Sequence, residues 1–175
     1  MNNTDDSLNT IWTGANYDKL RILVLGESWY GDYADNSDAG YIRMYLDESL
    51  SDSMYSRMAN ACGLSRNDFC NGIAFTNFVQ RIGDTRNCRP TIDDYQRAKA
   101  RLVALLQHLR PKGVWILGIE QSKYSTSVIE QIGISCEITA HPTSYGLSNA
   151  KLGASWHNLV AKTQHTPMPT QALET

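Results

Sequence analysis

The chain lacks the features that mark membrane proteins, secreted proteins and metal–thiolate sites. No apolar run approaches the roughly 18 residues that a membrane-spanning helix needs. The first ten residues are polar and acidic, without the basic and apolar regions of a signal peptide. Four cysteines lie far apart in the sequence, with no C-x-x-C pair. A disulfide framework and a tetrathiolate metal site are therefore disfavoured. We expect a cytoplasmic protein with no membrane partner.

The chain also has little net charge, but its charges are unevenly distributed. The formal net charge is −2 at pH 7. Residues 1–56 carry ten acidic and three basic side chains, whereas residues 57–112 carry ten basic and four acidic ones. A basic segment of this kind can form a phosphate-facing surface even in a mildly acidic protein.

The basic residues of the second segment fall into two groups. The periodicity of the sequence suggests that Arg97, Lys99 and Arg101 form only the solvated face of a helix. A second group lies in an irregular stretch after an apolar run, and we expect it to contact phosphates. Its members are Arg81, Arg86 and Arg89.

Apolar runs and helical periodicities alternate along the chain. Its 175 residues suffice for one domain with a substantial core. We place this domain at residues 1–163, followed by a disordered Thr/Pro/Gln-rich tail at 164–175. The expected strands are residues 20–25, 73–78, 114–117 and 134–140, after an irregular N-terminal arm. The expected helices are residues 41–50, 53–62, 123–132 and 150–161. A longer helix opens at Thr91, with Asp94 approximating a capping box, and stops at Pro111.

This alternation predicts an α/β protein whose parallel sheet carries helices on both faces. Polar residues stand at or directly after the ends of three of the expected strands. Gly26-Glu27-Ser28 follows the first strand, Asn77 stands near the end of the second, and His141 follows the last. Ligands of open α/β sheets bind beyond the carboxyl ends of the strands, so these side chains should converge on one crevice.

The same residues resemble the motifs of the uracil-DNA glycosylase superfamily. The resemblance includes Gly26-Glu27, the run from Phe75 to Val79, and Arg89-Pro90-Thr91 before a long helix. It continues through the run from Arg110 to Gly118 and ends at His141-Pro142-Thr143, covering residues 20 to about 160. The resemblance implies a three-layer α/β/α fold with a four-stranded parallel sheet. It also implies monofunctional cleavage of the N-glycosidic bond to a base flipped out of DNA.

The chemistry of the residues agrees with such a reaction. The amide of Asn77 offers both a donor and an acceptor, so it can read the edge of a uracil or of a cytosine. His141 can donate a hydrogen bond to the base anion that develops as the bond breaks. Glu27 can stabilise the cationic sugar and orient the attacking water. Asp32 is a second acidic candidate on the same loop, and Ser28 would line the same turn.

The resemblance assigns roles to further residues. It implies that an aromatic side chain near Tyr41 stacks on the base and that Tyr30 screens its C5 position. It places a side chain that wedges into the vacated base stack at Tyr145. Thr143, Ser144 and Gly146 then suit a turn pressed against phosphates. The expected partner is DNA, and the expected oligomeric state is a monomer.

Two departures from the family pattern affect the expected chemistry. Ser28 stands where the best-known uracil-specific branch has a water-activating aspartate. The Gly26-Glu27 pair instead resembles the branch that carries an iron–sulfur cluster, and Cys88 matches one of its ligands. The other ligand positions are absent, with Ala98 near the place of the next cysteine. We therefore expect neither a cluster nor any other metal or cofactor.

The segment after the Glu27 turn suggests an unusual target base. Residues 32–40 include Asp32, Asp35, Asn36 and Asp38, and such side chains can engage hydroxyl groups on a substituted base. This favours a pyrimidine with a bulky polar C5 substituent, for example a glucosylated hydroxymethylcytosine of phage DNA. The role would then be defence rather than repair. The objection is Tyr30, which would crowd C5 in the family pattern.

Two other functions remain open from the sequence. A strand that ends in Gly26-Glu27-Ser28 also resembles the Gly-Asp-Ser opening of small serine esterases. Those enzymes have an aspartate three residues before the catalytic histidine, where this chain has Ile138. The Gly-x-Ser-x-Gly elbow fails as well, because Tyr30 stands where glycine belongs. The remaining alternative is a catalytically silent DNA-binding module that kept the fold.

Overall fold

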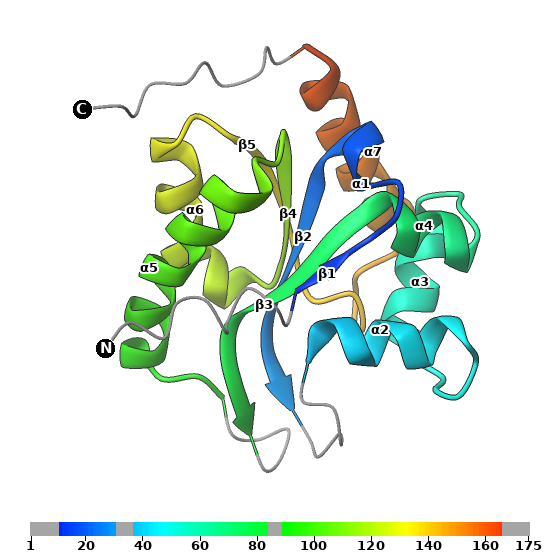
Figure 1. Ribbon diagram of the computed structural model, residues 1–175, viewed down its shortest axis with the longest axis horizontal. Helices are drawn as coiled ribbons and strands as arrows, with labels where there is room; N and C mark the ends of the chain where they lie inside the picture. The colour runs from blue at the N-terminus through cyan, green and yellow to red at the C-terminus, as the bar shows by residue number, and fades with distance from the viewer. Residues whose placement is uncertain (1–10, 31–36, 84–88, 166–175) are drawn as a thin grey trace.

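A computed structural model describes residues 11–30, 37–83 and 89–165, whose helices and strands form three layers (Figure 1). The central layer is a five-stranded sheet of order β1-β3-β2-β4-β5. Its strands are β1 (Trp12–Thr13), β2 (Ile22–Tyr30), β3 (Ile73–Gly83), β4 (Gly113–Leu117) and β5 (Ser135–Thr139). Four strands run parallel, and β1 pairs antiparallel with β3. The protein is a mixed α/β protein with a mostly parallel sheet.

Helices cover both faces of this sheet. One face carries α5 (Ile92–Leu109) and α6 (Ile119–Gln131) (Figure 1). The other carries α2 (Asp38–Leu46), α3 (Ser53–Ala61), α4 (Arg66–Gly72) and α7 (Asn149–His165), and the short α1 (Tyr17–Leu20) precedes β2. Alternate residues of β2 enter the two cores, because successive side chains of a strand point to opposite faces. Leu23 and Leu25 belong to the core under α5, and Ile22 and Val24 to the core under α3 and α7.

The start of the long helix is confirmed in detail. Thr91 caps α5, its hydroxyl accepting a hydrogen bond from the Asp94 N–H while the Asp94 carboxylate accepts one from the Thr91 N–H. This reciprocal capping box satisfies two backbone donors that have no partner inside the helix. The helix ends at Leu109, two residues before Pro111.

The number of strands differs from the expected four. The segment expected to be an irregular N-terminal arm contains β1, which pairs Trp12 with Phe75 and Thr13 with Ala74. It also contains α1. Two residues are too few to give an alternating pattern, so no periodicity could have indicated β1. Its position depends on tertiary contacts, including a hydrogen bond from the Trp12 indole to the Cys70 carbonyl (2.7 Å).

Two strands are also longer than expected. β2 continues past Leu25 to Tyr30, and β3 continues past Phe78 to Gly83, so residues 79–83, the first part of the irregular stretch expected at 79–90, are strand. The two extensions pair with each other, Ser28 with Val79 and Trp29 with Ile82, across a bulge. Glu27 and Ser28 therefore lie on β2 rather than directly after it, and Asn77 lies in the middle of β3 rather than near its end. Polar side chains broke the apolar pattern, although the backbone ladder continues through them.

Three helices also depart from expectation. α4 was not expected, and α6 begins at Ile119 rather than near Lys123. α7 continues to His165, past Ala161 and into the first two residues of the expected tail. Residues 166–175, the rest of that tail, lie outside the described residues. In the described part of the chain, no helix is both long enough and apolar enough to cross a membrane.

Candidate functional site

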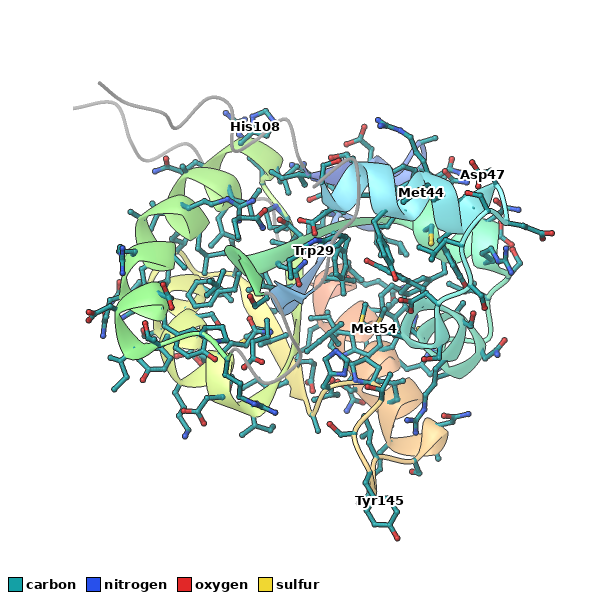
Figure 2. All side chains as sticks on the ribbon, turned by 90° about the horizontal axis from the view of Figure 1, so that it is seen from below. Trp29, Met44, Asp47, Met54, His108 and Tyr145 are labelled. Atoms are coloured by element: carbon teal, nitrogen blue, oxygen red, sulfur yellow. The ribbon has the colours of Figure 1, made fainter. Side chains whose placement is uncertain are left out.

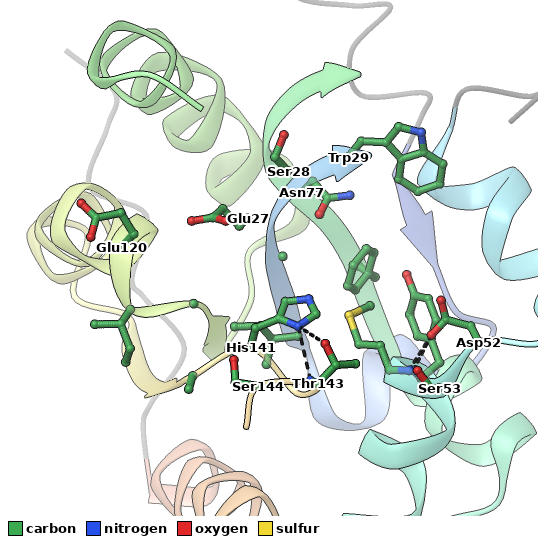
Figure 3. A pocket seen from close by; sticks show the side chains of 18 of the residues that line it. Glu27, Ser28, Trp29, Asp52, Ser53, Asn77, Glu120, His141, Thr143 and Ser144 are labelled. Atoms are coloured by element: carbon green, nitrogen blue, oxygen red, sulfur yellow. Dashed lines mark hydrogen bonds between the residues drawn. The ribbon is translucent and has the colours of Figure 1, made fainter. Parts of the chain in front are cut away.

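A cleft of about 690 Å³ opens at the carboxyl edge of the sheet (Figure 3). The pairing of β2 with β4 stops at Leu25 and Ile116, whereas the pairing of β2 with β3 continues. Beyond Leu117 the chain turns into α6, and the cleft is lined by the strand extensions, the start of α6 and the segment after β5. Gln121 holds the two diverging strands together, its buried amide donating to the carbonyls of Leu25 (3.0 Å) and Leu117 (2.9 Å).

The structure brings most of the predicted site residues to this cleft. Those that line it are Glu27, Ser28, Tyr41, Asn77, Arg89, His141, Thr143 and Ser144. Tyr145 does not line it and instead projects from the surface (Figure 2). Asp32 and Arg86 lie outside the described residues, as do Cys88 and the side chains of Tyr30 and Arg81. Residues from β2, β3 and the segment after β5 thus meet as the strand positions predicted.

Glu27 is held by an aromatic support that the sequence did not indicate. The Tyr95 hydroxyl, from α5, donates to Glu27 Oε1 at 2.8 Å. The Tyr95 ring is itself stacked on Tyr124, with centroids 4.7 Å apart and an interplanar angle of 11°. Arg89 Nη1 lies 3.9 Å from Glu27 Oε2, and the Glu27 side chain is 14% exposed. The carboxylate is therefore oriented by its neighbours but remains open to the cleft.

Asn77 belongs to a buried polar network centred on Asp38, the first residue of α2. Asp38 Oδ1 accepts from Asn77 Nδ2 at 2.7 Å. Asp38 Oδ2 accepts from the Thr76 hydroxyl at 2.7 Å and from the Asn77 N–H at 3.2 Å. Burial raises the pKa of Asp38, and the hydrogen bonds from Thr76 and Asn77 and the charge of Arg101 oppose this rise. Asp38 therefore faces the protein interior, which contradicts the expectation that it engages a ligand.

Arg101 is part of the same network rather than of a solvated helix face. Its guanidinium donates to the Asn77 carbonyl (3.1 Å) and to the Thr76 hydroxyl oxygen (3.0 Å). Burial lowers its pKa, and the charge of Asp38 opposes this effect. The helical periodicity placed Arg101 beside Arg97 and Lys99, but a long side chain can reach back over the helix to the sheet. Arg101 is therefore a partly buried member of the Asp38 network, contrary to the expectation that it is solvated.

Gly26 is the strand neighbour of Asn77 and leaves space for its amide. A Cβ atom on Gly26 would lie only 2.4 Å from Asn77 Oδ1. Any larger residue would therefore displace the Asn77 side chain. Close packing against Asn77 thus explains why position 26 is a glycine, independently of any resemblance.

His141 presents a defined tautomer to the cleft. Its Nδ1 accepts from the Thr143 N–H (3.3 Å) and lies 2.9 Å from the Thr143 hydroxyl (Figure 3). A backbone N–H can only donate, so the neutral imidazole carries its proton on Nε2. Partial burial lowers the pKa of His141, the charges of Glu27 and Asp52 oppose this shift, and that of Arg89 favours it. At neutral pH, His141 is therefore an uncharged hydrogen-bond donor.

Aromatic side chains also line the cleft. Trp29 and Tyr41 meet edge to face, with ring centroids 4.9 Å apart and an interplanar angle of 84°. The Tyr41 hydroxyl donates to Asp52 Oδ2 at 2.6 Å, and Asp52 also caps α3. Tyr41 is 9% exposed, so it contributes to the core and to the cleft surface together. Phe75 and Met54 complete an apolar surface beside Asn77.

One arginine side chain holds the turn after β5 through hydrogen bonds. Arg57, on α3, donates through its two Nη atoms to the carbonyls of Pro142 and Leu147. Its Nε donates to Asn149 Oδ1 at 2.7 Å. Tyr145, at the tip of this turn, is fully exposed to solvent. The turn therefore presents an exposed aromatic ring from a well-supported backbone.

The sequence did not predict the residues that hold the site residues in place. Asp38, Tyr95 and Arg57 come from three helices, and no sequence spacing relates them to the residues they hold. Asp38 follows a Ser37 helix cap, which is the only local signal that it starts a helix. Among the described residues, no cluster of three His, Cys, Asp or Glu side chains could hold a metal ion.

The chain was also compared with known proteins. No protein-family model matches it, and no curated protein matches it either.

Proposed function

We propose that this protein is a monofunctional DNA glycosylase that hydrolyses the N-glycosidic bond of a flipped-out pyrimidine. The candidate bases are uracil and a C5-modified cytosine. The supporting observation is that a carboxylate (Glu27), a base-reading amide (Asn77) and a neutral imidazole donor (His141) line one cleft. These three groups match the three tasks of the reaction. The same motifs carry the resemblance to the uracil-DNA glycosylase superfamily.

The reaction would use the groups as they are oriented. Asn77 binds the edge of the base and holds it against the aromatic side of the cleft. As the C1′–N1 bond breaks, its electron pair moves to the base, and the Nε2–H of His141 stabilises the charge at O2. Glu27 stabilises the cationic sugar and accepts a proton from the water that attacks C1′. The base leaves as an anion that takes up a proton from solvent, and Glu27 releases to solvent the proton it accepted, so the products are the free base and an abasic site with an intact strand.

The dimensions of the cleft leave room for a substituted base. Pockets of roughly 300–1,000 Å³ accommodate drug-sized ligands, and this cleft of about 690 Å³ falls within that range. A plain pyrimidine would fill only part of it. A role in defence against phages with modified DNA is therefore proposed beside a role in repair.

The serine esterase alternative is less compatible with the site. A catalytic serine needs a histidine nitrogen that can accept its proton. Thr143 occupies His141 Nδ1, so the other nitrogen of the neutral ring carries a proton and cannot act as a base. A hydrolase built on Ser28 would therefore need a different arrangement of this histidine.

The test is incubation with duplexes that carry uracil, hypoxanthine, 5-hydroxymethylcytosine or glucosylated hydroxymethylcytosine at one position. We expect strand breaks only after alkaline treatment, which cleaves abasic sites. Breaks without alkali would contradict a monofunctional mechanism. Duplex binding with no abasic site on any substrate would favour a silent DNA-binding module.

A further inference from the structure

The buried network around Asp38 has a consequence for base recognition, which depends on the orientation of the Asn77 amide. One end of that amide is a donor and the other an acceptor, and their order determines which base edge fits. Asn77 Nδ2 donates to Asp38 Oδ1 at 2.7 Å, which turns Oδ1 toward Gly26. In Figure 3 the Asn77 oxygen lies on the side of His141 and the nitrogen is turned away from it.

The surroundings of Asp38 resist a reversed amide. Asp38 Oδ2 accepts from the Thr76 hydroxyl and from the Asn77 N–H, and the Gln80 amide lies 3.5 Å from it. Arg101 supports the group through Thr76 and the Asn77 carbonyl. All the groups that contact the Asp38 carboxylate directly are hydrogen-bond donors, so both of its oxygens act as acceptors. A reversed amide would place Asn77 Oδ1 against a carboxylate oxygen, and two acceptors repel each other.

The order of the strands shows which end of the Asn77 amide faces His141. Along the sheet, β2 lies between β3, which carries Asn77, and β4 and β5, which lead to His141. Asn77 Oδ1 therefore faces the His141 side and Nδ2 the opposite side. A pyrimidine whose O2 meets His141 presents N3 next along its edge and position 4 beyond it. Oδ1 then meets N3, and the second hydrogen of Nδ2 meets position 4.

We propose that Asp38 is a positioning residue that determines which base the cleft accepts. By holding Asn77 Nδ2, it presents an acceptor to N3 and a donor to position 4. Uracil and its C5-substituted forms match this order, because they carry N3–H and O4. Cytosine and its C5-substituted forms carry the opposite order and would meet two like groups. This inference rests on the proposed function, and it favours uracil-type over cytosine-type targets.

The test compares matched duplexes that differ only in the base edge. The pairs are uracil against cytosine and 5-hydroxymethyluracil against 5-hydroxymethylcytosine, each opposite the same base. For the wild-type protein we expect kcat/KM to favour the uracil member by about 10⁴-fold, as in sites that reject a substrate lacking the matching polar group. Equal excision of both members would overturn the inference.

The diagnostic variant is Asp38→Asn. The new carboxamide at position 38 can keep its acceptor toward Thr76 and donate to Asn77 Oδ1, which permits the reversed amide. We expect the uracil-to-cytosine ratio to fall by at least about 100-fold, a large part of the selectivity that such a site provides. A merely structural role would lower both rates and leave their ratio unchanged, which would also overturn the inference. The control is Asp68→Asn, the same exchange in the first turn of α4, which should leave both rates and the ratio unchanged.

A binding measurement separates this inference from the proposed function. Free uracil and free cytosine are titrated into the wild-type protein while the side-chain amide of Asn77 is followed by NMR. Selective binding of uracil without excision of any base would support the role of Asp38 and defeat the glycosylase proposal. Equal binding of both bases would overturn the role of Asp38 even if excision is found. This measurement needs no variant and so does not depend on how Asp38→Asn folds.

Discussion

The two sides of the cleft are built in different ways. The strand wall, which consists of Gly26, Glu27 and Asn77, is continuous with the buried sheet and is supported by Asp38, Thr76 and Tyr95. The turn wall, residues 142–146, follows His141 and carries the exposed ring of Tyr145 at its tip. Within the described residues, the turn wall is held mainly by hydrogen bonds from Arg57 on α3.

This difference separates two kinds of function. Precise placement of reacting groups requires side chains whose positions are fixed by packing and hydrogen bonds. Contact with a large duplex requires exposed groups on a supported backbone. The strand wall suits the first task and the turn wall the second. Substitutions in the strand wall should therefore affect chemistry and selectivity, and those in the turn wall should affect duplex binding.

The largest effect is expected for Glu27→Gln in the strand wall. The amide can still accept a hydrogen bond from Tyr95, but it cannot stabilise a cation or accept a proton. We expect kcat to fall by about 10²–10⁴-fold, the range typical of a general acid–base group, with little change in melting temperature or duplex affinity. The control is Glu137→Gln. In the wild-type protein, Glu137 on β5 pairs with Lys162 on α7 at 2.6 Å. Equal losses in both variants would refute the assigned role.

The next effect is expected for Gly26→Ala. The added Cβ would lie 2.4 Å from Asn77 Oδ1, so the amide must move. A displacement of this kind can lower activity by about 10²-fold, and overpacking destabilises by about 1–3 kcal/mol. Gly72→Ala is the matched control, because a Cβ there meets no atom within 4 Å. Activity and denaturant unfolding of the two variants test this prediction, and a fully active Gly26→Ala protein would contradict it.

A pH titration probes the junction of the two walls at His141. Its pKa is lowered from 6.5, chiefly by burial, so the neutral form should persist below pH 6.5. An added proton must go to Nδ1 and would displace the Thr143 N–H. We therefore expect excision to fall as pH drops through this lowered pKa. NMR titration of the imidazole should show a midpoint below 6.5, and Glu27→Gln should lower it further, because that charge opposes the shift. A midpoint above 6.5 would be inconsistent with this environment.

A smaller effect is expected for Arg57→Lys, which loosens the turn wall. A single ammonium group cannot serve three separated acceptors as the planar guanidinium does. Loss of charge-assisted hydrogen bonds worth about 1.5 kcal/mol or more should weaken duplex binding by about 10-fold. Turnover of saturating single-stranded substrate should change little. Arg43→Lys, on the exposed face of α2, provides a control for the exchange itself. An equal loss of turnover on both substrates would show that the two walls are not separable.

The smallest effect on the folded protein is expected for Tyr145→Ala. The ring is fully exposed, so stability should change by less than about 0.5 kcal/mol. Excision should weaken more on duplex than on single-stranded DNA, because only a paired base must be extruded from a stack. Tyr145→Phe should retain most of the duplex activity. Equal losses on both substrates would place Tyr145 in another role.

Local sequence signals were sufficient for most of the outline of the fold and for predicting that polar residues from three strands meet at one cleft. The apolar runs located four strands, and Thr91 with Asp94 located the start of α5. Polar residues that interrupt or follow apolar runs indicated Glu27, Asn77 and His141. These signals succeed because burial alternation and helix capping depend on residues close together in the chain.

Tertiary structure alone decided how those residues are held. Asp38 and Asn77 are 39 positions apart, Glu27 and Tyr95 are 68 apart, and Arg57 reaches carbonyls 85 and 90 positions away. Arg101 was misassigned for the same reason, since its partners lie on the sheet and not on its own helix. The sequence therefore determined which chemical groups reach the cleft. Their orientation, and with it the direction of the Asn77 amide, depends on contacts that exist only after the sheet and its helices have packed together.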